Sequence, residues 1–320
     1  MNRIAVTMGD PAGIGAEIIV RSLPRIVAHS IPVVIGDMAV IDGLCARLPS
    51  LPRPDFKEPG RGTLKDVEFV DLGLIDTVEP GRSDGRCGNA SYRYIDEALK
   101  RVFTGEASAI VTCPISKVSL RLAGIPFPGH TELLAHVAGV DSYVMMLANP
   151  AIRVSLVTIH IPLKDVPARI TEERVFRTIA ITGRSLRESF SIQRPVVKVC
   201  GLNPHAGEKG VIGHEEETIT RAILRAQRMG MDVTGPYPGD SAFHHIDCDA
   251  YVAMYHDQGL IPVKTIDFKR TVNVTLGLPF VRTSPGHGTG FDIAGKGIAD
   301  PTSLIEAYRT AEVMTGRTRP

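Results

Sequence analysis

The sequence contains no tryptophan, few other aromatic residues and no excess of either charge. Its 320 residues include 36 Lys and Arg against 35 Asp and Glu, and aromatic residues make up 5%. Nucleic-acid-binding proteins usually present a basic face, and those that bind single strands add aromatic side chains that stack on bases. The composition therefore argues against a nucleic-acid partner, and any site for an anion must be local.

C-x-x-C pairs and long apolar runs are also missing, and the first residues do not have the pattern expected of a secretory signal. An odd number of scattered cysteines without a C-x-x-C pair indicates reduced thiols rather than a disulfide framework. No apolar run approaches the ~20 residues of a membrane-spanning helix, and the first residues lack the three regions of a secretory signal. We therefore expect a cytoplasmic protein with no membrane partner. The cysteines are Cys45, Cys87, Cys113, Cys200 and Cys248.

Short β-branched runs alternate with longer amphipathic stretches along the chain. This alternation predicts an α/β protein with largely parallel sheets, and the length is sufficient for two domains. The predicted strands are residues 3–7, 32–35, 109–112, 152–160, 196–202 and 250–255. The predicted helices are residues 15–25, 90–104, 172–189 and 215–229.

Two glycine-containing segments each precede the expected start of a helix. Met8–Gly15 follows the first strand, where its glycines either let the backbone approach an anion or form a structural turn. The G-x-G-x-x-G spacing of dinucleotide-binding loops is absent from it. In Gly124–Glu132, His130 and Thr131 offer an imidazole, a hydroxyl and backbone N–H groups that suit a phosphate. The alternative is that Thr131 caps the helix and His130 is exposed.

Three histidines each end an apolar run: His160, His205 and His256. Converging from strand ends, three neutral imidazoles would hold a divalent ion and leave coordination positions open for a substrate. Any one such histidine is more often a hydrogen-bonded structural residue than a metal ligand, but three in equivalent positions shift the balance toward a site.

Further polar residues occupy the C-terminal part of the chain. Lys264, Asn273 and Arg282 are nine residues apart, so the cations could clamp a phosphate while the amide orients a hydroxyl or carboxylate. Surface positions would explain each of them separately. The segment Ser284–Pro301 is rich in glycine and forms either a ligand-binding loop or a long structural turn.

The residues HGTGFDIAGKGIADP (287–301) resemble the nucleotide loop HGSAPDIAGKGIANP of the isocitrate and isopropylmalate dehydrogenases. Together with MGDPAGIG, AGIPFPGHTE, GLNPHAGE, MYHDQG and NVTLGLPFVRTS, they make the whole chain similar to the 4-hydroxythreonine-4-phosphate dehydrogenase family. The resemblance implies two α/β/α domains of the isocitrate/isopropylmalate dehydrogenase type. It also implies an active site in the interdomain cleft, shared between the subunits of a homodimer. We place residues 1–130 with 275–320 in the domain of the nucleotide loop, and residues 131–274 in the domain of the metal histidines and dimer interface.

The resemblance also assigns roles to individual residues. It implies a divalent metal, zinc first with magnesium or cobalt as alternatives, and NAD as cofactor, with NADP as the alternative. One metal ligand would reach across the dimer interface. The implied metal ligands are His160, His205 and His256. The implied substrate-binding residues are His130, Thr131, Lys264, Asn273 and Arg282. The implied cofactor-binding residues are His287, Gly288, Thr289 and Asp292. The implied catalytic residues are Asp240 and Lys264.

The implied reaction is the NAD-dependent oxidation and decarboxylation of 4-phosphohydroxy-L-threonine to 3-amino-2-oxopropyl phosphate in pyridoxal phosphate synthesis. Paralogues that act on 4-phospho-D-threonate or 4-phospho-D-erythronate, and related cis-dihydrodiol dehydrogenases, share the three histidines. Leu133 and Leu134 stand where many vitamin B6 enzymes have aromatic residues, so these substrates remain alternatives. The alternative of another class is a ligand-binding protein without catalytic activity.

Overall fold

The computed structural model describes residues 2–127 and 129–316. The chain forms two compact units, one of residues Met1–Gly139 with Leu278–Pro320 and the other of residues Val140–Gly277. The sequence placed the first division after residue 130 instead. That residue begins a helix, α5 (His130–Val137), whose buried residues Leu133 and Leu134 belong with the first unit, so the division falls after the helix.

The first unit contains a fully parallel sheet of six strands in the order β3-β4-β2-β1-β5-β12. Its central strands are runs of buried β-branched and small residues, which is typical of parallel strands covered on both faces. The carboxyl ends of β1, β5 and β12 lie at one edge of the sheet, where ligands of doubly wound folds bind. The strands are β1 (Arg3–Thr7), β2 (Ile31–Gly36), β3 (Phe56–Lys57), β4 (Val67–Asp71), β5 (Ala109–Thr112) and β12 (Val281–Pro285).

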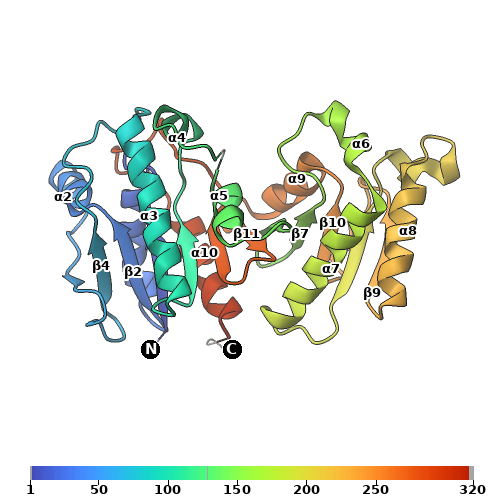
Figure 1. Ribbon diagram of the computed structural model, residues 1–320, viewed down its shortest axis with the longest axis horizontal. Helices are drawn as coiled ribbons and strands as arrows, with labels where there is room; N and C mark the ends of the chain where they lie inside the picture. The colour runs from blue at the N-terminus through green and yellow to red at the C-terminus, as the bar shows by residue number, and fades with distance from the viewer. Residues whose placement is uncertain (1, 128, 317–320) are drawn as a thin grey trace. The chain divides into compact units, whose positions relative to one another are not determined.

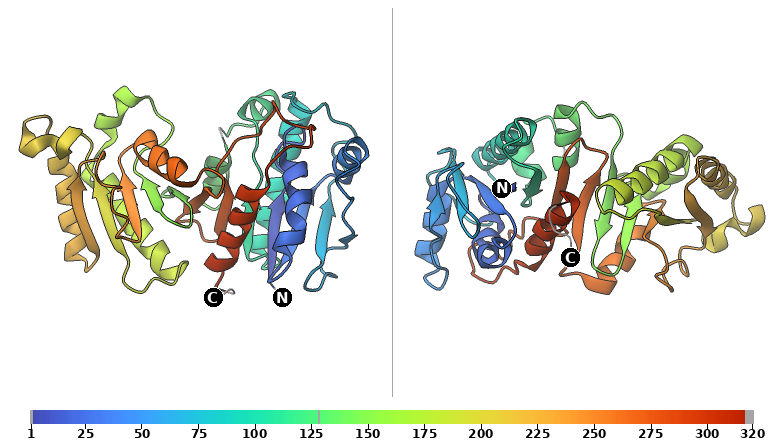
Figure 2. Two further views of the ribbon diagram at one scale, coloured as in Figure 1. Left: turned by 180° about the vertical axis from the view of Figure 1, so that it is seen from behind. Right: turned by 90° about the horizontal axis from the view of Figure 1, so that it is seen from below.

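Helices cover both faces of this sheet. Helix α3 packs on one face, in front of the strands in Figure 1, while α1 and α10 pack together on the other, seen from behind in Figure 2. Asp84 begins α3 by accepting a hydrogen bond from the backbone N–H of Arg86. The helices are α1 (Gly15–Ile26), α2 (Met38–Arg47), α3 (Gly85–Phe103), α4 (Lys117–Leu122), α5 and α10 (Thr302–Met314).

The second unit contains a mixed sheet in the order β11-β6-β7-β10-β8-β9. Its pairs β7/β10, β10/β8 and β8/β9 are parallel, whereas β6 is antiparallel to both of its neighbours. The strands are β6 (Val144–Ala148), β7 (Arg153–Leu156), β8 (Val196–Cys200), β9 (Asp232–Tyr237), β10 (Ala250–Ala253) and β11 (Val272–Leu276). The helical segments are η1 (Leu163–Asp165), α6 (Val166–Arg169), α7 (Glu172–Glu188), η2 (Pro204–Gly210), α8 (Glu215–Arg228) and α9 (His256–Asp267).

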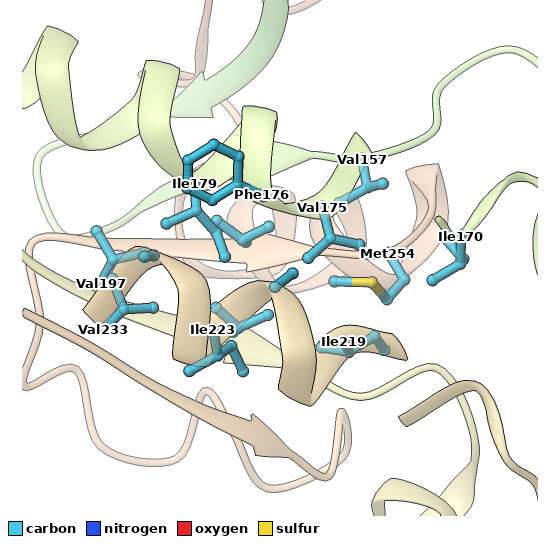
Figure 3. Packing of buried hydrophobic residues seen from close by; sticks show 14 of the residues in the cluster. Val157, Ile170, Val175, Phe176, Ile179, Val197, Ile219, Ile223, Val233 and Met254 are labelled. Atoms are coloured by element: carbon cyan, nitrogen blue, oxygen red, sulfur yellow. The ribbon is translucent and has the colours of Figure 1, made fainter. Parts of the chain in front are cut away.

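Alternate residues of β10 divide the second unit into two cores. Val252 belongs to the buried cluster that includes Ile179 of α7 and Ile223 of α8, both of which are labelled in Figure 3. Tyr251 points to the opposite face and packs with Val263 of α9. Side chains of a strand alternate between faces, so this single strand contributes to both layers. Each unit is therefore an α/β/α sandwich, which confirms the predicted fold class.

Most predicted elements are present, with differences at their ends. Strands β1 and β5 have the predicted bounds, and α1, α7 and α8 differ by one residue at their ends. The strand predicted over residues 152–160 ends at Leu156, because the chain turns at Ile159–Pro162. Helix α3 begins five residues before the predicted position because Asp84 caps it. No described helix is long and apolar enough to cross a membrane, and no described cysteine forms a disulfide.

Candidate active site

A buried arginine side chain lies at the carboxyl end of β5. Arg282 of β12 is 2% exposed, and its Nη2 atom donates a hydrogen bond of 2.7 Å to Oγ1 of Thr112, the last residue of β5. Burial lowers the pKa of Arg282 to about 10, and the nearby Glu132 works against that change. The guanidinium therefore remains charged at neutral pH.

His130 lies beside this cation, at the start of α5. Its Nε2 atom is buried and has no hydrogen-bond partner among the described residues. Burial lowers the pKa of His130 well below its usual value, and the charge of Arg282 lowers it further, while a hydrogen bond to the backbone of Cys113 opposes both. The ring is therefore uncharged at neutral pH.

Helix α5 does not begin where one interpretation of the sequence predicted. Gly129, not Thr131, is the N-cap residue of α5, and Thr131 lies in the first helical turn. The expectation of an exposed His130 also fails, because Nε2 is buried. A helix N-terminus attracts anions through its free N–H groups and its dipole, so Arg282, His130 and the start of α5 together form a potential anion site.

The glycine-rich segment Met8–Gly15 forms a turn against the nucleotide loop, the name used here for residues 284–301. The backbone N–H of Ile14 donates to the carbonyl oxygen of Thr289 at 3.0 Å. A side chain at Gly13 would meet the same carbonyl, and Gly290 packs against Ile14. The first glycine segment thus supports the nucleotide loop. The backbone N–H of Ile14 is used in this contact rather than for an anion.

Helix α1 fastens the other end of the nucleotide loop. Glu17 is 1% exposed, and its Oε1 atom accepts hydrogen bonds from the N–H of Ala299 at 2.9 Å and from Nε of Arg21 at 3.0 Å. Arg21 in turn donates from Nη2 to the carbonyl oxygen of Gly297. These bonds hold residues 297–299 on the helix, and we call this arrangement the Glu17 clasp.

The expected cofactor residues lie at and around the first of these attachments, with Asp292 between the two. His287 has a buried Nε2 without a described hydrogen-bond partner, and its Nδ1 contacts the carbonyl oxygen of Gly288 at 3.0 Å. Gly288 is exposed, with open space where a side chain would stand. Asp292 is exposed as well, so its carboxylate is accessible to a ligand.

Two of the three expected metal ligands meet in the second unit. The imidazole centroids of His160 and His256 are 5.7 Å apart. Both line a pocket of about 270 Å³ with Tyr255 and Asp257, and Nδ1 of His256 is 2.7 Å from Oδ1 of Asp257. Two imidazoles at this separation fit two ligands of one tetrahedral ion, with a carboxylate beside one ring as metal sites often have.

The third expected ligand does not join that pair within the chain. His205 is exposed in η2, where residues 205–209 all have positive φ. No set of three His, Cys, Asp or Glu residues able to hold a metal occurs among the residues that the structure describes. The histidine pair is therefore incomplete as a three-ligand site in a single chain.

The remaining expected residues of the second unit are spread over three elements. Lys264 lies on α9 with its Nζ atom 5.5 Å from the ring centroid of Phe268. Asn273 lies on β11, and its Oδ1 atom is buried without a described partner. Asp240 is exposed in the turn after β9. The structure does not bring Asp240 and Lys264 into a hydrogen bond that would mark a catalytic pair.

The sequence analysis did not identify two residues that support the site. Thr112 bonds to Arg282 from a position 170 residues away in the sequence, and Glu17 reaches the N–H of Ala299 across 282 residues. The signal for Thr112 was its place at the end of a buried strand, where side chains of α/β sheets face ligands. Glu17 had no comparable signal, because a glutamate in a first helical turn is ordinary.

A family model described as the pyridoxal phosphate biosynthetic protein PdxA matches residues 28–311 of the chain. The chain is 42% identical over 321 residues to a 4-hydroxythreonine-4-phosphate dehydrogenase of Sulfurihydrogenibium sp., with 98% of each protein covered. It is 43% identical over 329 residues to a D-threonate 4-phosphate dehydrogenase of Cupriavidus necator, again with 98% of each covered. Overall identity thus does not separate these two substrates.

Solved structures agree with these matches. A crystal structure of 4-hydroxythreonine-4-phosphate dehydrogenase from Klebsiella pneumoniae superposes with a TM-score of 0.89 at 37% identity, covering 98% of each chain. Isocitrate dehydrogenase from Methylococcus capsulatus superposes with a TM-score of 0.51 at 14% identity, covering 99% of this chain and 86% of the other. The second match shows a shared fold alone. With a family model over most of its length and relatives matched from end to end, the chain belongs to the pyridoxal phosphate biosynthetic protein PdxA family.

Proposed function

We propose that the protein is an NAD-dependent, metal-assisted dehydrogenase that oxidises a secondary alcohol on a small phosphorylated hydroxy acid. The first candidate substrate is 4-phosphohydroxy-L-threonine. The observation that supports this most is the buried, charged guanidinium of Arg282 beside the uncharged His130 at the start of α5. A guanidinium is well suited to phosphate and carboxylate oxygens, and the adjacent helix start adds N–H groups, so the site is suited to an anionic group of a substrate.

In this proposal the first unit binds the anion and the cofactor. Arg282 supplies the charge, His130 and Thr131 supply hydrogen bonds, and the N–H groups at the start of α5 contribute partial positive charge. The nucleotide loop binds the dinucleotide, with Asp292 accepting hydrogen bonds from ribose hydroxyls. A carboxylate there favours NAD, because the 2′-phosphate of NADP would meet a like charge.

The second unit supplies the metal ligands. His160 and His256 would hold a divalent ion, zinc first, and His205 of a partner subunit would complete the set in a homodimer. When bound, such an ion acts as a Lewis acid toward the substrate hydroxyl and the ketone that replaces it. The exposed position of His205 on η2 is compatible with a role outside its own chain.

The remaining polar residues orient the substrate and move protons. Lys264 and Asn273 are proposed to bind the substrate, and Lys264 or Asp240 to accept the hydroxyl proton. NAD, when bound, would supply the hydride acceptor for the oxidation, which would leave a ketone β to the carboxylate and so prepare the substrate to lose carbon dioxide. We expect this activity in the cytoplasm, where thiols such as those of the five cysteines stay reduced.

The test is NADH formation by metal-loaded protein given 4-phosphohydroxy-L-threonine, 4-phospho-D-threonate and 4-phospho-D-erythronate in parallel. A chelator accompanies each reaction as a control. Chelator-sensitive turnover of the first substrate supports the proposal in full. Turnover of only the second or third keeps the chemistry and corrects the substrate.

The absence of NADH formation with all three substrates would contradict the proposal as stated. The same protein would then be tested with an aromatic cis-dihydrodiol acid, which needs the metal and NAD but has no phosphate. Metal and NAD binding without turnover of any of these compounds would favour a ligand-binding protein instead.

A further inference from the structure

We infer that Thr112 is a positioning residue, which sets the guanidinium of Arg282 in the orientation that binds the anionic group of the substrate. The inference rests on the proposed function, since it takes Arg282 as the anion-binding residue. Its basis is the hydrogen bond of 2.7 Å from Nη2 of Arg282 to Oγ1 of Thr112, in which both side chains are buried.

The register of the sheet explains why these two residues meet. In the parallel pair β12/β5, Arg282 lies opposite Ile110. Residues 110 and 112 point to the same face of β5, because side chains of a strand alternate. Thr112 is therefore the diagonal neighbour of Arg282 on a shared face, within reach of a long side chain.

The chemistry of the pair favours a positioning role over general packing. A guanidinium presents its donors in a rigid planar fork, so one bond at Nη2 defines the plane for the others. The threonine side chain is stiff at χ1, which makes its hydroxyl a well-placed acceptor. A hydroxyl, unlike a carboxylate, brings no negative charge, so this bond orients the guanidinium without offsetting its positive charge.

The other member of the anion site lies near the same strand end. The backbone of Cys113, the residue that follows Thr112, is close enough to His130 to act on the pKa of its imidazole. A change of side chain at Thr112 leaves that backbone in place. It should therefore act on the anion affinity through Arg282.

The chain offers a matched control. Thr7 of β1 lies directly opposite Thr112 in the parallel pair β1/β5, and both residues are fully buried. The hydroxyl of Thr7 has no hydrogen-bond partner among the described residues. Replacing either threonine by valine removes one hydroxyl at constant shape, so only Thr112→Val should affect the anion.

The experiment compares wild type with Thr112→Val, Thr112→Ser and Thr7→Val. Calorimetry measures the Kd of inorganic phosphate for the metal-loaded protein, and steady-state assays measure KM and kcat for the phosphorylated substrate. Loss of one hydrogen bond to a charged group should raise both the phosphate Kd and KM about tenfold in Thr112→Val, with kcat changed far less. Thr112→Ser should restore values near those of wild type.

Three results with the variants would overturn the inference. They are an unchanged phosphate Kd in Thr112→Val, an equal rise in Thr7→Val, or no rescue by serine in a variant whose Tm matches wild type. Phosphate that fails to bind the wild type would also overturn it. Failure of the proposed function is a different result: no candidate substrate is oxidised, yet phosphate still binds and Thr112→Val still weakens it.

Discussion

At the scale of single residues, the candidate site contains the buried positive charge of Arg282. A guanidinium that is 2% exposed has lost most of its hydration, and its lowered pKa reflects that loss. Its donors form a planar fork that matches the oxygens of phosphates and carboxylates. The residue is therefore suited to an anionic ligand.

We expect Arg282→Lys to separate charge from geometry. Lysine keeps a positive charge but has no planar fork, so it should bind a phosphate without the paired hydrogen bonds of arginine. KM for the phosphorylated substrate should rise by about tenfold or more, with a smaller change in kcat. A steady-state assay measures both constants, and an unchanged KM would show that another residue binds the anion.

A second residue-scale prediction concerns His130 and acid stability. Its folded-state pKa is lowered, so below the unfolded pKa of about 6.5 the unfolded chain binds more protons than the folded one. The contribution of His130 is complete above that pH and is lost as the pH falls toward its folded-state pKa. Wild type should therefore lose free energy of unfolding between pH 7 and 5 more steeply than His130→Gln.

Urea titrations at several pH values would measure this difference. His136→Gln is the control, because that imidazole is exposed on the same helix. Parallel slopes for wild type and His130→Gln would mean that the ring of His130 is not buried in its neutral form.

At the scale of elements, α1 and the nucleotide loop form one structural piece. The loop is attached at Thr289 through Ile14 and at residues 297–299 through the Glu17 clasp. A loop held at both ends before a ligand arrives loses less conformational entropy on binding. The affinity for the dinucleotide should therefore depend on residues of α1 that do not touch it.

We expect Glu17→Gln to weaken NAD binding several-fold without a comparable effect on the substrate. Glutamine keeps an oxygen acceptor but loses the charge that pairs with Arg21, so the clasp loosens while the side-chain volume is conserved. Titration of NAD by calorimetry measures the effect. Glu97→Gln in α3 removes the same kind of i,i+4 pair with Arg101 away from the loop and serves as the control. Equal NAD affinities in all three proteins would argue against the clasp.

Elements with strong local patterns could be predicted from the sequence, whereas contacts between distant segments could not. The bounds of β1 and β5 could be predicted, because runs of β-branched residues between turn residues are typical of strands. The start of α3 was missed because its cap, Asp84, lies in a polar segment without periodicity. The Thr112–Arg282 bond depends on strand order, which no local pattern encodes. The roles of the individual site residues stay predictions.

At the scale of the whole molecule, the proposed metal ligands could come from one chain or from two. His160 and His256 meet in one chain, and His205 is exposed on η2 without joining them. A homodimer with a two-fold axis could supply His205 from each subunit to the pair of the other, because such an interface uses the same contacts twice. The proposed metal site then exists only in the assembled protein.

Mixed dimers test this arrangement directly. His205→Ala and His256→Ala homodimers should each bind little metal and be nearly inactive, since every site lacks a ligand. A heterodimer of the two variants, purified through two different tags, should contain one intact site and one doubly defective site. Its activity and zinc content should therefore be about half those of wild type. If all three ligands came from the same chain, every site in the heterodimer would lack one, and neither activity nor zinc would recover.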